Sequence, residues 1–241
     1  MKKNKLIKLR RELTTNNIDG YIIPKNDEFF GEYVSPENER LKYLTGFSGS
    51  AGQSLVLKKK AFIFVDGRYT LQAQKEERKG FKVIQIHKTK PSEILKKNKQ
   101  KLRIGFDPRI YSLASLINLY KTENVKLIPV NKNLIDKIWP NKPKLKFNKF
   151  FILKTRYAGK SFKNKINLIC NTLKRKKIKN LLVTAPENVA WALNIRGKDN
   201  SYSPIPNCNA IVNYKKKITL IVEDKKISKN FKSQFGKIVK Y

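Results

Sequence analysis

Apolar residues recur along the first part of the chain with the spacing of a helix and then of a strand. Leu6, Leu9 and Leu13 repeat at helical spacing, and the polar run at 14–17 ends this helix before an apolar run at 18–24, which predicts a strand. The next predicted elements are, in order, a helix at 39–44, a glycine-rich loop at 46–52, strands at 54–57 and 61–65, a helix at 69–77, a strand at 81–86, a helix from 91, a strand at 102–106, a helix at 113–120 and a strand at 125–130. This alternation of strands and helices predicts an α/β domain.

The second half repeats the same pattern. A helical stripe at 166–173 leads into an apolar run at 178–184, which parallels the run at 18–24. Two further apolar runs at 210–214 and 218–222 are joined by three lysines, as the runs at 54–57 and 61–65 are. A tandem duplication of one α/β unit is the simplest explanation.

The repeat also predicts domain boundaries. We expect a first domain at 1–130, a linker at 131–146 that contains Trp139 and two prolines, and a second domain at 147–241. The second copy ends at 237–241, where the strand that matches 81–86 is expected, so we expect the second domain to be incomplete. The expected fold is therefore α/β, with two tandem and similar domains, each a mixed sheet flanked by helices.

The composition is that of a folded protein with an unusual charge. The 241 residues are 40% hydrophobic, and 54 Lys and Arg against 18 Asp and Glu give a net charge of +36. Such a charge suggests a polyanion partner, such as nucleic acid or anionic lipid. The lysines are nevertheless spread over every segment, as an AT-biased genome would also produce, and no nucleic-acid-binding motif accompanies them. Both explanations stay open, and the second is favoured.

The remaining composition points to the cytoplasm. Cys170 and Cys208 have no CxxC spacing, so they are expected to be reduced thiols. The basic start of the chain is not followed by a continuous apolar run, and no stretch approaches the length of a membrane span.

Few residues have the pattern of catalytic chemistry. His87 is the only histidine and has no nucleophile or ligand-spaced carboxylates near it in sequence, which argues against histidine triads and zinc sites. The isolated carboxylates are expected to accept hydrogen bonds at turns and caps; they are Asp19, Asp66, Asp107 and Asp136. The glycine loop lacks the Lys-Ser/Thr ending of a phosphate loop.

Arg68 has two open interpretations. It follows a predicted strand and a turn glycine within Asp66-Gly67-Arg68-Tyr69. A guanidinium at such a strand end can bind a ligand carboxylate, or it can pair with a neighbouring carboxylate and stabilise the turn.

Several segments together resemble one family. The runs at 19–24 and 27–29, the run ERLKYLTGFSGSAG at 39–52 and the run VDGRY at 65–69 resemble the N-terminal, creatinase-type domain of aminopeptidase P enzymes. The runs at 157–161, 190–197 and 202–207 are similar to the middle domain of the three-domain members. The resemblance covers nearly the whole chain in order.

The resemblance implies a metal-dependent exopeptidase that removes an N-terminal residue preceding proline. It also implies a two-metal site, usually with manganese, built from two Asp, one His and two Glu on a C-terminal "pita-bread" domain. No matching ligand set is found in this sequence, so we expect no catalytic residue and no metal ligand here, and no peptidase activity from this chain alone. The front domains of the family contribute dimer contacts and narrow the access to the active site. By their motif positions, Phe47, Arg68 and Tyr69 are the candidates for that entrance.

Three hypotheses follow. In the first, the chain is the non-catalytic front portion of an Xaa-Pro aminopeptidase, with the catalytic domain, a second copy and proline-containing peptides as partners. In the second, it is a stand-alone binding or scaffold protein derived from that family. In the third, its positive charge makes it a weak polyanion binder.

Overall fold

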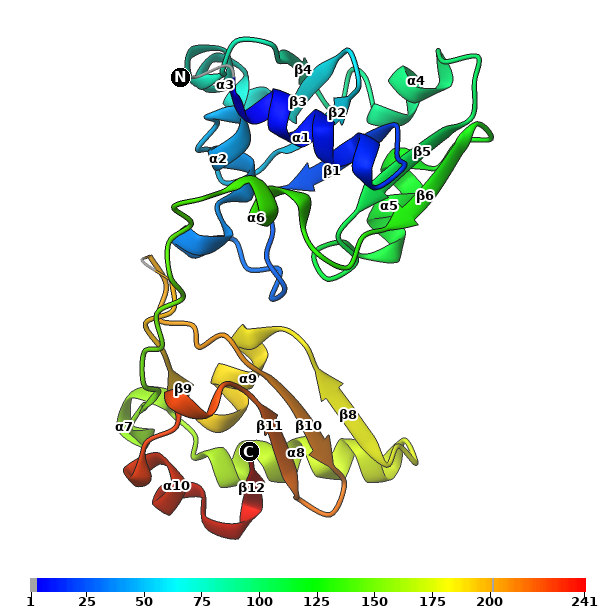
Figure 1. The fold of residues 1–241 in the computed structure, drawn as a ribbon. Coiled ribbons are helices and arrows are strands. Elements are labelled where there is room, and N and C mark those ends of the chain that lie inside the picture. Colours follow the sequence, from blue (N-terminus) through cyan, green and yellow to red (C-terminus); the bar gives the residue numbers. More distant parts are fainter. Residues whose placement is uncertain (1–3, 201) are drawn as a thin grey trace. The chain divides into compact units, whose positions relative to one another are not determined.

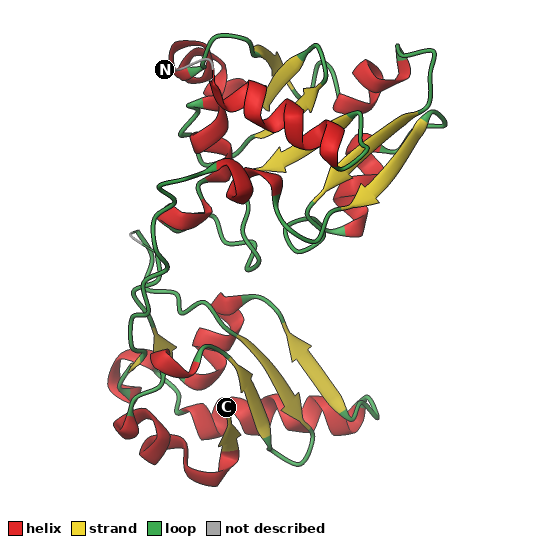
Figure 2. Cartoon of the chain, in the orientation of Figure 1, coloured by secondary structure: helices red, strands yellow, loops and turns green. Residues whose placement is uncertain are grey.

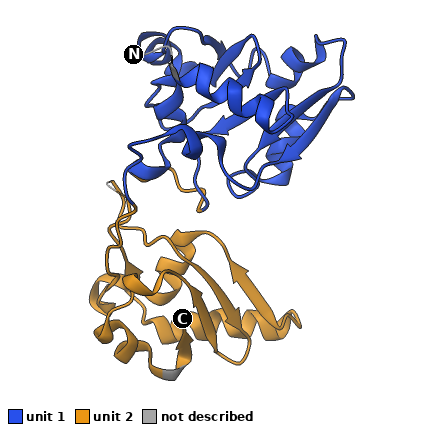
Figure 3. Ribbon diagram, in the orientation of Figure 1, with its two compact units in different colours: residues 1–28, 36–144 blue, residues 29–35, 145–241 orange. Residues whose placement is uncertain are grey.

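The computed structural model describes residues 4–200 and 202–241, so that residues 1–3 of the basic start lie outside the described part. The chain forms two compact units, one of residues 1–28 and 36–144 and the other of residues 29–35 and 145–241, coloured separately in Figure 3. Both units alternate helices and strands, which confirms the predicted α/β class (Figure 2).

The first unit is built on a six-stranded mixed sheet with the order β4-β3-β2-β1-β5-β6 (Figure 1). Its elements are α1 (Asn4–Thr15), β1 (Gly20–Pro24), η1 (Pro36–Asn38), α2 (Arg40–Thr45), β2 (Gln53–Leu57), β3 (Ala61–Val65), η2 (Gly67–Tyr69), α3 (Thr70–Glu76), β4 (Lys82–Gln85), α4 (Pro91–Lys96), β5 (Leu102–Phe106), α5 (Leu113–Tyr120), β6 (Val125–Pro129) and α6 (Leu134–Ile138). β1 is antiparallel to β2 and parallel to β5, and β3 is antiparallel to β2 and parallel to β4.

The two faces of this sheet have separate cores. On one face, side chains of β1, β2 and β3 pack with α1, α2, α3 and α6. On the other face, alternate side chains of the same strands pack with α4, α5 and the segment before α5. Because both faces are covered, every residue of β1, β2 and β3 is buried, which explains their continuous apolar runs.

The second unit has a four-stranded sheet with the order β12-β11-β10-β8. Its elements are β7 (Phe151–Ile152), α7 (Thr155–Ala158), α8 (Phe162–Arg175), β8 (Asn180–Val183), α9 (Pro186–Leu193), β9 (Ile195–Arg196), β10 (Asn209–Asn213), β11 (Ile218–Ile221), η3 (Asp224–Lys226), α10 (Lys229–Phe235), η4 (Gly236–Ile238) and β12 (Val239–Lys240). β7 and β9 form a separate two-stranded sheet. The larger sheet packs one face against α8, α9 and α10 in a single core.

The strand directions confirm that the two units repeat one another. β8, β10, β11 and β12 take the places of β1, β2, β3 and β4, because β10 is antiparallel to both β8 and β11, and β12 is parallel to β11. Burial alternates along β11 and along β10, as expected for strands with one covered face. The counterpart of β4 is present as the short strand β12 at 239–240, although the sequence analysis expects the chain to end before it.

The predicted linker at 131–146 differs from the structure in its first half. Residues 134–138 form α6, and Leu134, Ile135 and Ile138 are buried in a core of the first unit. Trp139 packs against the same core and stacks on Tyr43, with 4.4 Å between ring centroids. Prolines and lysines are typical of linkers, so the composition of this segment predicted one. Its three apolar residues are buried because α1 and α2 pack against them, which the local sequence does not show.

Candidate functional site

The glycine loop between α2 and β2 encloses a buried phenylalanine. Gly46 caps the C-terminal end of α2 with φ 90°, and a Cβ there would lie 2.3 Å from the carbonyl oxygen of Glu76. Phe47 follows and is fully buried. The loop then closes over its ring, since a Cβ on Gly49 would lie 2.3 Å from Phe47 Cζ. Small residues are therefore required here by packing, as the sequence indicates.

Arg68 lies at the corner between β3 and α3. Its Nη2 donates to Asp66 Oδ2 at 2.8 Å, its Nε donates to Asp66 Oδ1 at 3.2 Å, and Asp66 Oδ1 also accepts the backbone N–H of Arg68 at 2.9 Å. The hydrogen bond from the Arg68 side chain lowers the pKa of Asp66 below its ordinary value. The Arg68 side chain remains 77% exposed. The turn-stabilising pair is thus formed, and the guanidinium still has a solvent-exposed surface.

Tyr69 connects this corner to the glycine loop. Its hydroxyl lies 2.7 Å from Ser50 Oγ, and its ring meets Phe47 edge-on, with 5.8 Å between centroids. The Arg68 guanidinium lies 5.4 Å from the centroid of the same ring. The fold therefore brings together the three entrance candidates, with Phe47 inside, Tyr69 partly covered and Arg68 at the surface.

Glu76 is a further member of this corner, and the sequence analysis did not single it out. Its carboxylate accepts the backbone N–H of Ser48 at 2.7 Å and the hydroxyl of Ser48 at 2.8 Å, and it also accepts Gln72 Nε2 at 3.0 Å. Burial would raise the pKa of Glu76, but these hydrogen bonds outweigh burial and lower it. The spacing of Gln72 and Glu76 on one helix face was the available signal; the contact across 28 residues was not predictable.

A hollow of about 740 Å³ opens beside this loop. It is lined by Lys42, Gly46, Ser48, Lys75, Glu76, Glu77, Arg78 and Lys79. Basic and acidic side chains both line this pocket, so its charge does not indicate one class of ligand.

A cluster of charged and polar side chains connects α6 to the rest of the first unit. Arg40 is 3% exposed and donates to Asp136 through Nε at 2.9 Å and through Nη2 at 3.0 Å. Nearby, Asp107 accepts from Arg109 Nη2 at 2.7 Å and from Asn133 Nδ2 at 2.9 Å. Burial would raise the pKa of Asp107, but these donors outweigh it and hold the pKa below its ordinary value.

All four isolated carboxylates accept structural hydrogen bonds, but only Asp66 and Asp107 do so at a local turn or cap as expected, whereas Asp19 and Asp136 accept from distant residues. Asp66 accepts at a cap, Asp107 and Asp136 accept from arginines, and Asp19 accepts Lys58 Nζ at 2.7 Å and the backbone N–H of Arg103 at 2.9 Å. Within residues 4–200 and 202–241, no three His, Cys, Asp or Glu side chains are grouped so that they could hold a metal ion. The side chains of this part of the chain therefore do not fit a two-metal site.

Both cysteines are free and buried. Burial raises the pKa of Cys208 to about 12, so its thiol is not a nucleophile near neutral pH. Among the described residues, no helix is long and apolar enough to cross a membrane.

Two family models match the chain, one after the other. Both are described as the creatinase/prolidase N-terminal domain, and they match residues 5–138 and 141–241. Among solved structures, X-prolyl aminopeptidase from Caenorhabditis elegans, described as a cytosolic enzyme with a di-nuclear active site, is similar over 99% of this chain and 42% of its own, with a TM-score of 0.86 and 25% identity.

Curated relatives agree with this structural match. A probable Xaa-Pro aminopeptidase P from Coprinopsis cinerea is 30% identical over 98% of this chain. Xaa-Pro aminopeptidase 1 from Dictyostelium discoideum is 31% identical over 95% of this chain. In both cases the chain spans 39% of the relative's length.

Proposed function

Because the chain belongs to the creatinase/prolidase N-terminal domain family, we propose that it forms the non-catalytic front portion of a metal-dependent Xaa-Pro aminopeptidase. The observation that carries the proposal is the pair of consecutive matches at 5–138 and 141–241, which together account for almost the whole chain. The likeness to one aminopeptidase over 99% of this chain, at a TM-score of 0.86, supports the same order of domains along the chain.

In this proposal, a separate catalytic domain removes an N-terminal residue that precedes proline. That domain would hold two metal ions, manganese by the family resemblance, which would supply an activated water and charge stabilisation. The di-nuclear active site described for the Caenorhabditis elegans relative supports a metal requirement. In this proposal the metal ligands belong to the catalytic domain, and the described residues of this chain shape the access of substrate to it.

The corner formed by the glycine loop and η2 is the proposed contribution to substrate access. Arg68 presents a guanidinium that is 77% exposed and can bind the carboxylate of a peptide substrate or an acidic group of the catalytic domain. Tyr69 lies next to it, with its hydroxyl 2.7 Å from Ser50 Oγ and its ring packed edge-on against buried Phe47. Phe47 therefore acts by positioning its neighbours.

Two further features belong to the same proposal. We propose contacts to a second copy of the enzyme as a role of these front domains, which the resemblance supports. We also propose a cytoplasmic location, which the description of the Caenorhabditis elegans relative as cytosolic supports.

The proposal is tested with two proteins. The purified chain, incubated with an Xaa-Pro-Xaa peptide and manganese, should release no amino acid, and metal-dependent turnover by the pure chain would contradict the proposal. A chimera in which residues 1–241 replace the matching front region of the Dictyostelium discoideum relative should hydrolyse the peptide. A folded but inactive chimera would favour the scaffold function instead.

Variants of the chimera separate the two interpretations of Arg68. If Arg68 binds a carboxylate at the entrance, Arg68→Ala should lower kcat/KM about tenfold, and Arg68→Lys should restore it only in part, because lysine lacks the planar fork. Asp66→Ala is the matched control, since it removes the same pair and keeps the guanidinium. If both alanine variants lower the thermal midpoint equally and keep full kcat/KM, Arg68 only stabilises the turn.

A further inference from the structure

The direction of the strands in the first sheet brings three lysine-rich segments to one edge. β1, β3, β4, β5 and β6 all run the same way, because β2 is antiparallel to β1 and β3 and every other neighbouring pair is parallel. The turn at 58–60 leads from β2 into β3, the segment at 96–101 precedes β5, and the segment at 121–126 contains the start of β6 (Figure 1). All three segments therefore lie at the edge where these strands begin, which we name the amino edge.

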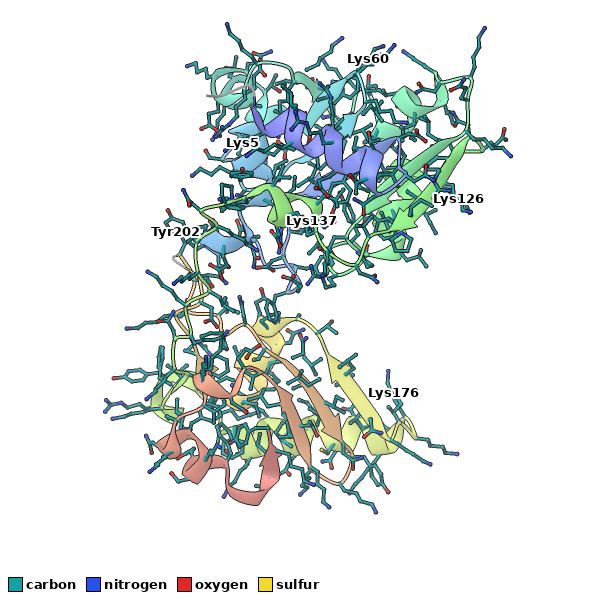
Figure 4. The ribbon with its side chains drawn as sticks, in the orientation of Figure 1. Lys5, Lys60, Lys126, Lys137, Lys176 and Tyr202 are labelled. Carbon is teal, nitrogen blue, oxygen red and sulfur yellow. The ribbon has the colours of Figure 1, made fainter. Side chains whose placement is uncertain are left out.

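The lysines of the amino edge are exposed and mostly unpaired. Every lysine of the three segments is exposed, and Glu123 is the one carboxylate within these segments. Lys58 forms an ion pair with Asp19 at 2.7 Å, and among the described residues no ion pair involves any other lysine of the three segments. Figure 4 shows Lys60 and Lys126, which belong to the first and the third segment, on the outside of the unit. The amino edge thus presents a row of solvated positive charges.

The opposite edge, where the same strands end, contains carboxylates together with cations. Glu28 follows β1, Asp66 follows β3 and Asp107 follows β5. Arginines neutralise two of these carboxylates, since Arg68 binds Asp66 at 2.8 Å and Arg109 binds Asp107 at 2.7 Å. The fold therefore separates an excess of positive charge at the amino edge from a mixture of both signs at the edge that holds the entrance corner.

This separation of charge is a property of the tertiary structure. Codon bias accounts for the number of lysines but not for their separation from carboxylates, because it would place lysine at exposed positions of both edges alike. The three segments are far apart along the chain, so their charges form one surface only when the sheet has formed. A surface of one sign attracts polyanions and raises their rate of association.

The side chains of the amino edge distinguish between kinds of polyanion. The three segments contain no aromatic side chain on which an unpaired base could stack, and Val125, their one apolar residue, is not exposed. A bilayer therefore meets no apolar side chain there that could enter its interface. Lysine ammonium groups bind phosphate as point charges and do not require one fixed geometry. These features favour a ligand that is recognised by its phosphates alone.

The length of the amino edge fits a nucleic-acid duplex. Neighbouring strands lie about 4.8 Å apart, so the edge from β3 to β6, in the order β3-β2-β1-β5-β6, covers roughly 19 Å. A duplex carries one charge per about 1.7 Å of its axis, which gives about eleven charges over this length. An extended acidic polypeptide offers about half as many, because its residues rise about 3.3 Å each. The duplex therefore matches the row of lysines with the higher density of charge.

We propose that the amino edge of the first unit binds the phosphate backbone of double-stranded nucleic acid, independently of base sequence, through the lysines at 58–60, 96–101 and 121–126. Binding of this kind has a dissociation constant of roughly 1–100 µM at physiological salt and weakens steeply as salt is added, because each phosphate contact releases condensed counterions. The surface lies at the edge opposite the entrance corner of Arg68 and Tyr69, so this binding function is separate from the proposed role in substrate access.

Two variants of the full chain with equal net charge test the proposal. The amino-edge variant combines Lys60→Gln, Lys101→Gln and Lys126→Gln. The matched control, the opposite-edge variant, changes three exposed lysines that follow β4 and β6, namely Lys88→Gln, Lys90→Gln and Lys132→Gln. A third variant places arginine at the three positions of the amino-edge variant; it keeps the charge and should bind like the unchanged chain, which separates lost charge from lost structure.

Binding is measured by the fluorescence anisotropy of a labelled duplex of about 20 base pairs, at salt concentrations from about 50 to 200 mM. The amino-edge variant should bind roughly tenfold more weakly than the unchanged chain at about 100 mM salt. Its plot of log affinity against log salt concentration should be shallower by about 2–3, because each lost phosphate contact removes about 0.9 from the slope. The opposite-edge variant should change the slope by less than about 1, and a duplex of unrelated sequence should bind equally well.

Three outcomes would overturn the proposal. One is equal weakening by the amino-edge and opposite-edge variants, or no weakening by either, which indicates general charge attraction. Another is unchanged duplex binding by the amino-edge variant together with lost binding to phosphatidylcholine vesicles that contain phosphatidylserine, which identifies a membrane surface as the ligand. A third is complete displacement of the duplex by poly-glutamate at the same concentration of charge, which identifies an acidic polypeptide as the better ligand.

Discussion

Asp136→Ala is expected to destabilise the first unit by weakening the attachment of α6 to α2. The substitution removes both acceptors of Arg40, whose side chain is 3% exposed and pairs with Asp136 at 2.9 Å and 3.0 Å. The guanidinium would remain buried, with the Glu28 carboxylate 3.8 Å from its Nη2.

The size of the effect follows from this burial. Removing one partner of a buried ion pair costs about 3–5 kcal/mol. Asp136 is itself 26% exposed and Glu28 keeps part of the attraction, so we expect about 2–3 kcal/mol, a drop of roughly 6–12 °C in the midpoint of the first unit.

Trp139 makes the assay specific, because it follows α6 directly and stacks on Tyr43. Thermal unfolding is followed by tryptophan fluorescence in a Trp191→Phe background, which leaves Trp139 as the single reporter. Lys142→Ala is the matched control: it removes the other partner of Asp136, at 2.9 Å, and should cost less than about 1 kcal/mol, as partly exposed ion pairs do. Equal midpoints for Asp136→Ala and Lys142→Ala would refute the argument that the buried pair anchors α6.

Three other predictions concern the same unit. Gly49→Ala should destabilise it by about 1–3 kcal/mol because the added Cβ would lie 2.3 Å from buried Phe47, whereas Gly67→Ala, with 3.6 Å to its nearest neighbour, should change the thermal midpoint little. Asp107→Asn should make the free energy of unfolding depend less on pH in the acid range. The pKa of Asp107 is lowered in the folded state, so its contribution to stability is present above the ordinary carboxyl range and is lost as the pH falls through the lowered value. Urea unfolding at stepwise lower pH measures this loss. Limited proteolysis should cut within 140–149, which has no helix or strand, and spare 134–138; early cleavage inside 134–138, seen by mass spectrometry, would contradict the burial of α6.

The local elements were largely predictable because their signals are local. The stripe of Leu6, Leu9 and Leu13 predicted α1, and the lysine turns at 58–60 and 215–217 predicted both hairpins. The order of these elements also predicted the α/β class and the repeat. Periods of 3.6 and 2 residues express burial on one helix side or one sheet face, so they are visible without a structure.

The candidate corner was predictable only in part. Their motif positions made Phe47, Arg68 and Tyr69 candidates for one entrance, and the structure brings the three side chains together. Their exposures were not predictable, because the burial of Phe47 depends on a glycine loop that folds back over its ring. The same applies to Glu76, whose partner Ser48 lies 28 residues earlier.

By itself, the sequence determined the elements, their order and their duplication, since each depends on residues that are close along the chain. Tertiary structure decided which apolar residues are covered. It buries α6 through a contact between Arg40 and Asp136 that spans 96 residues, and it leaves Leu182 exposed although Leu182 occupies the place of fully buried Ile22. Burial is a property of the neighbours that the fold brings to a side chain, and two equally apolar strands differ as soon as only one of them has a strand and helices beside it.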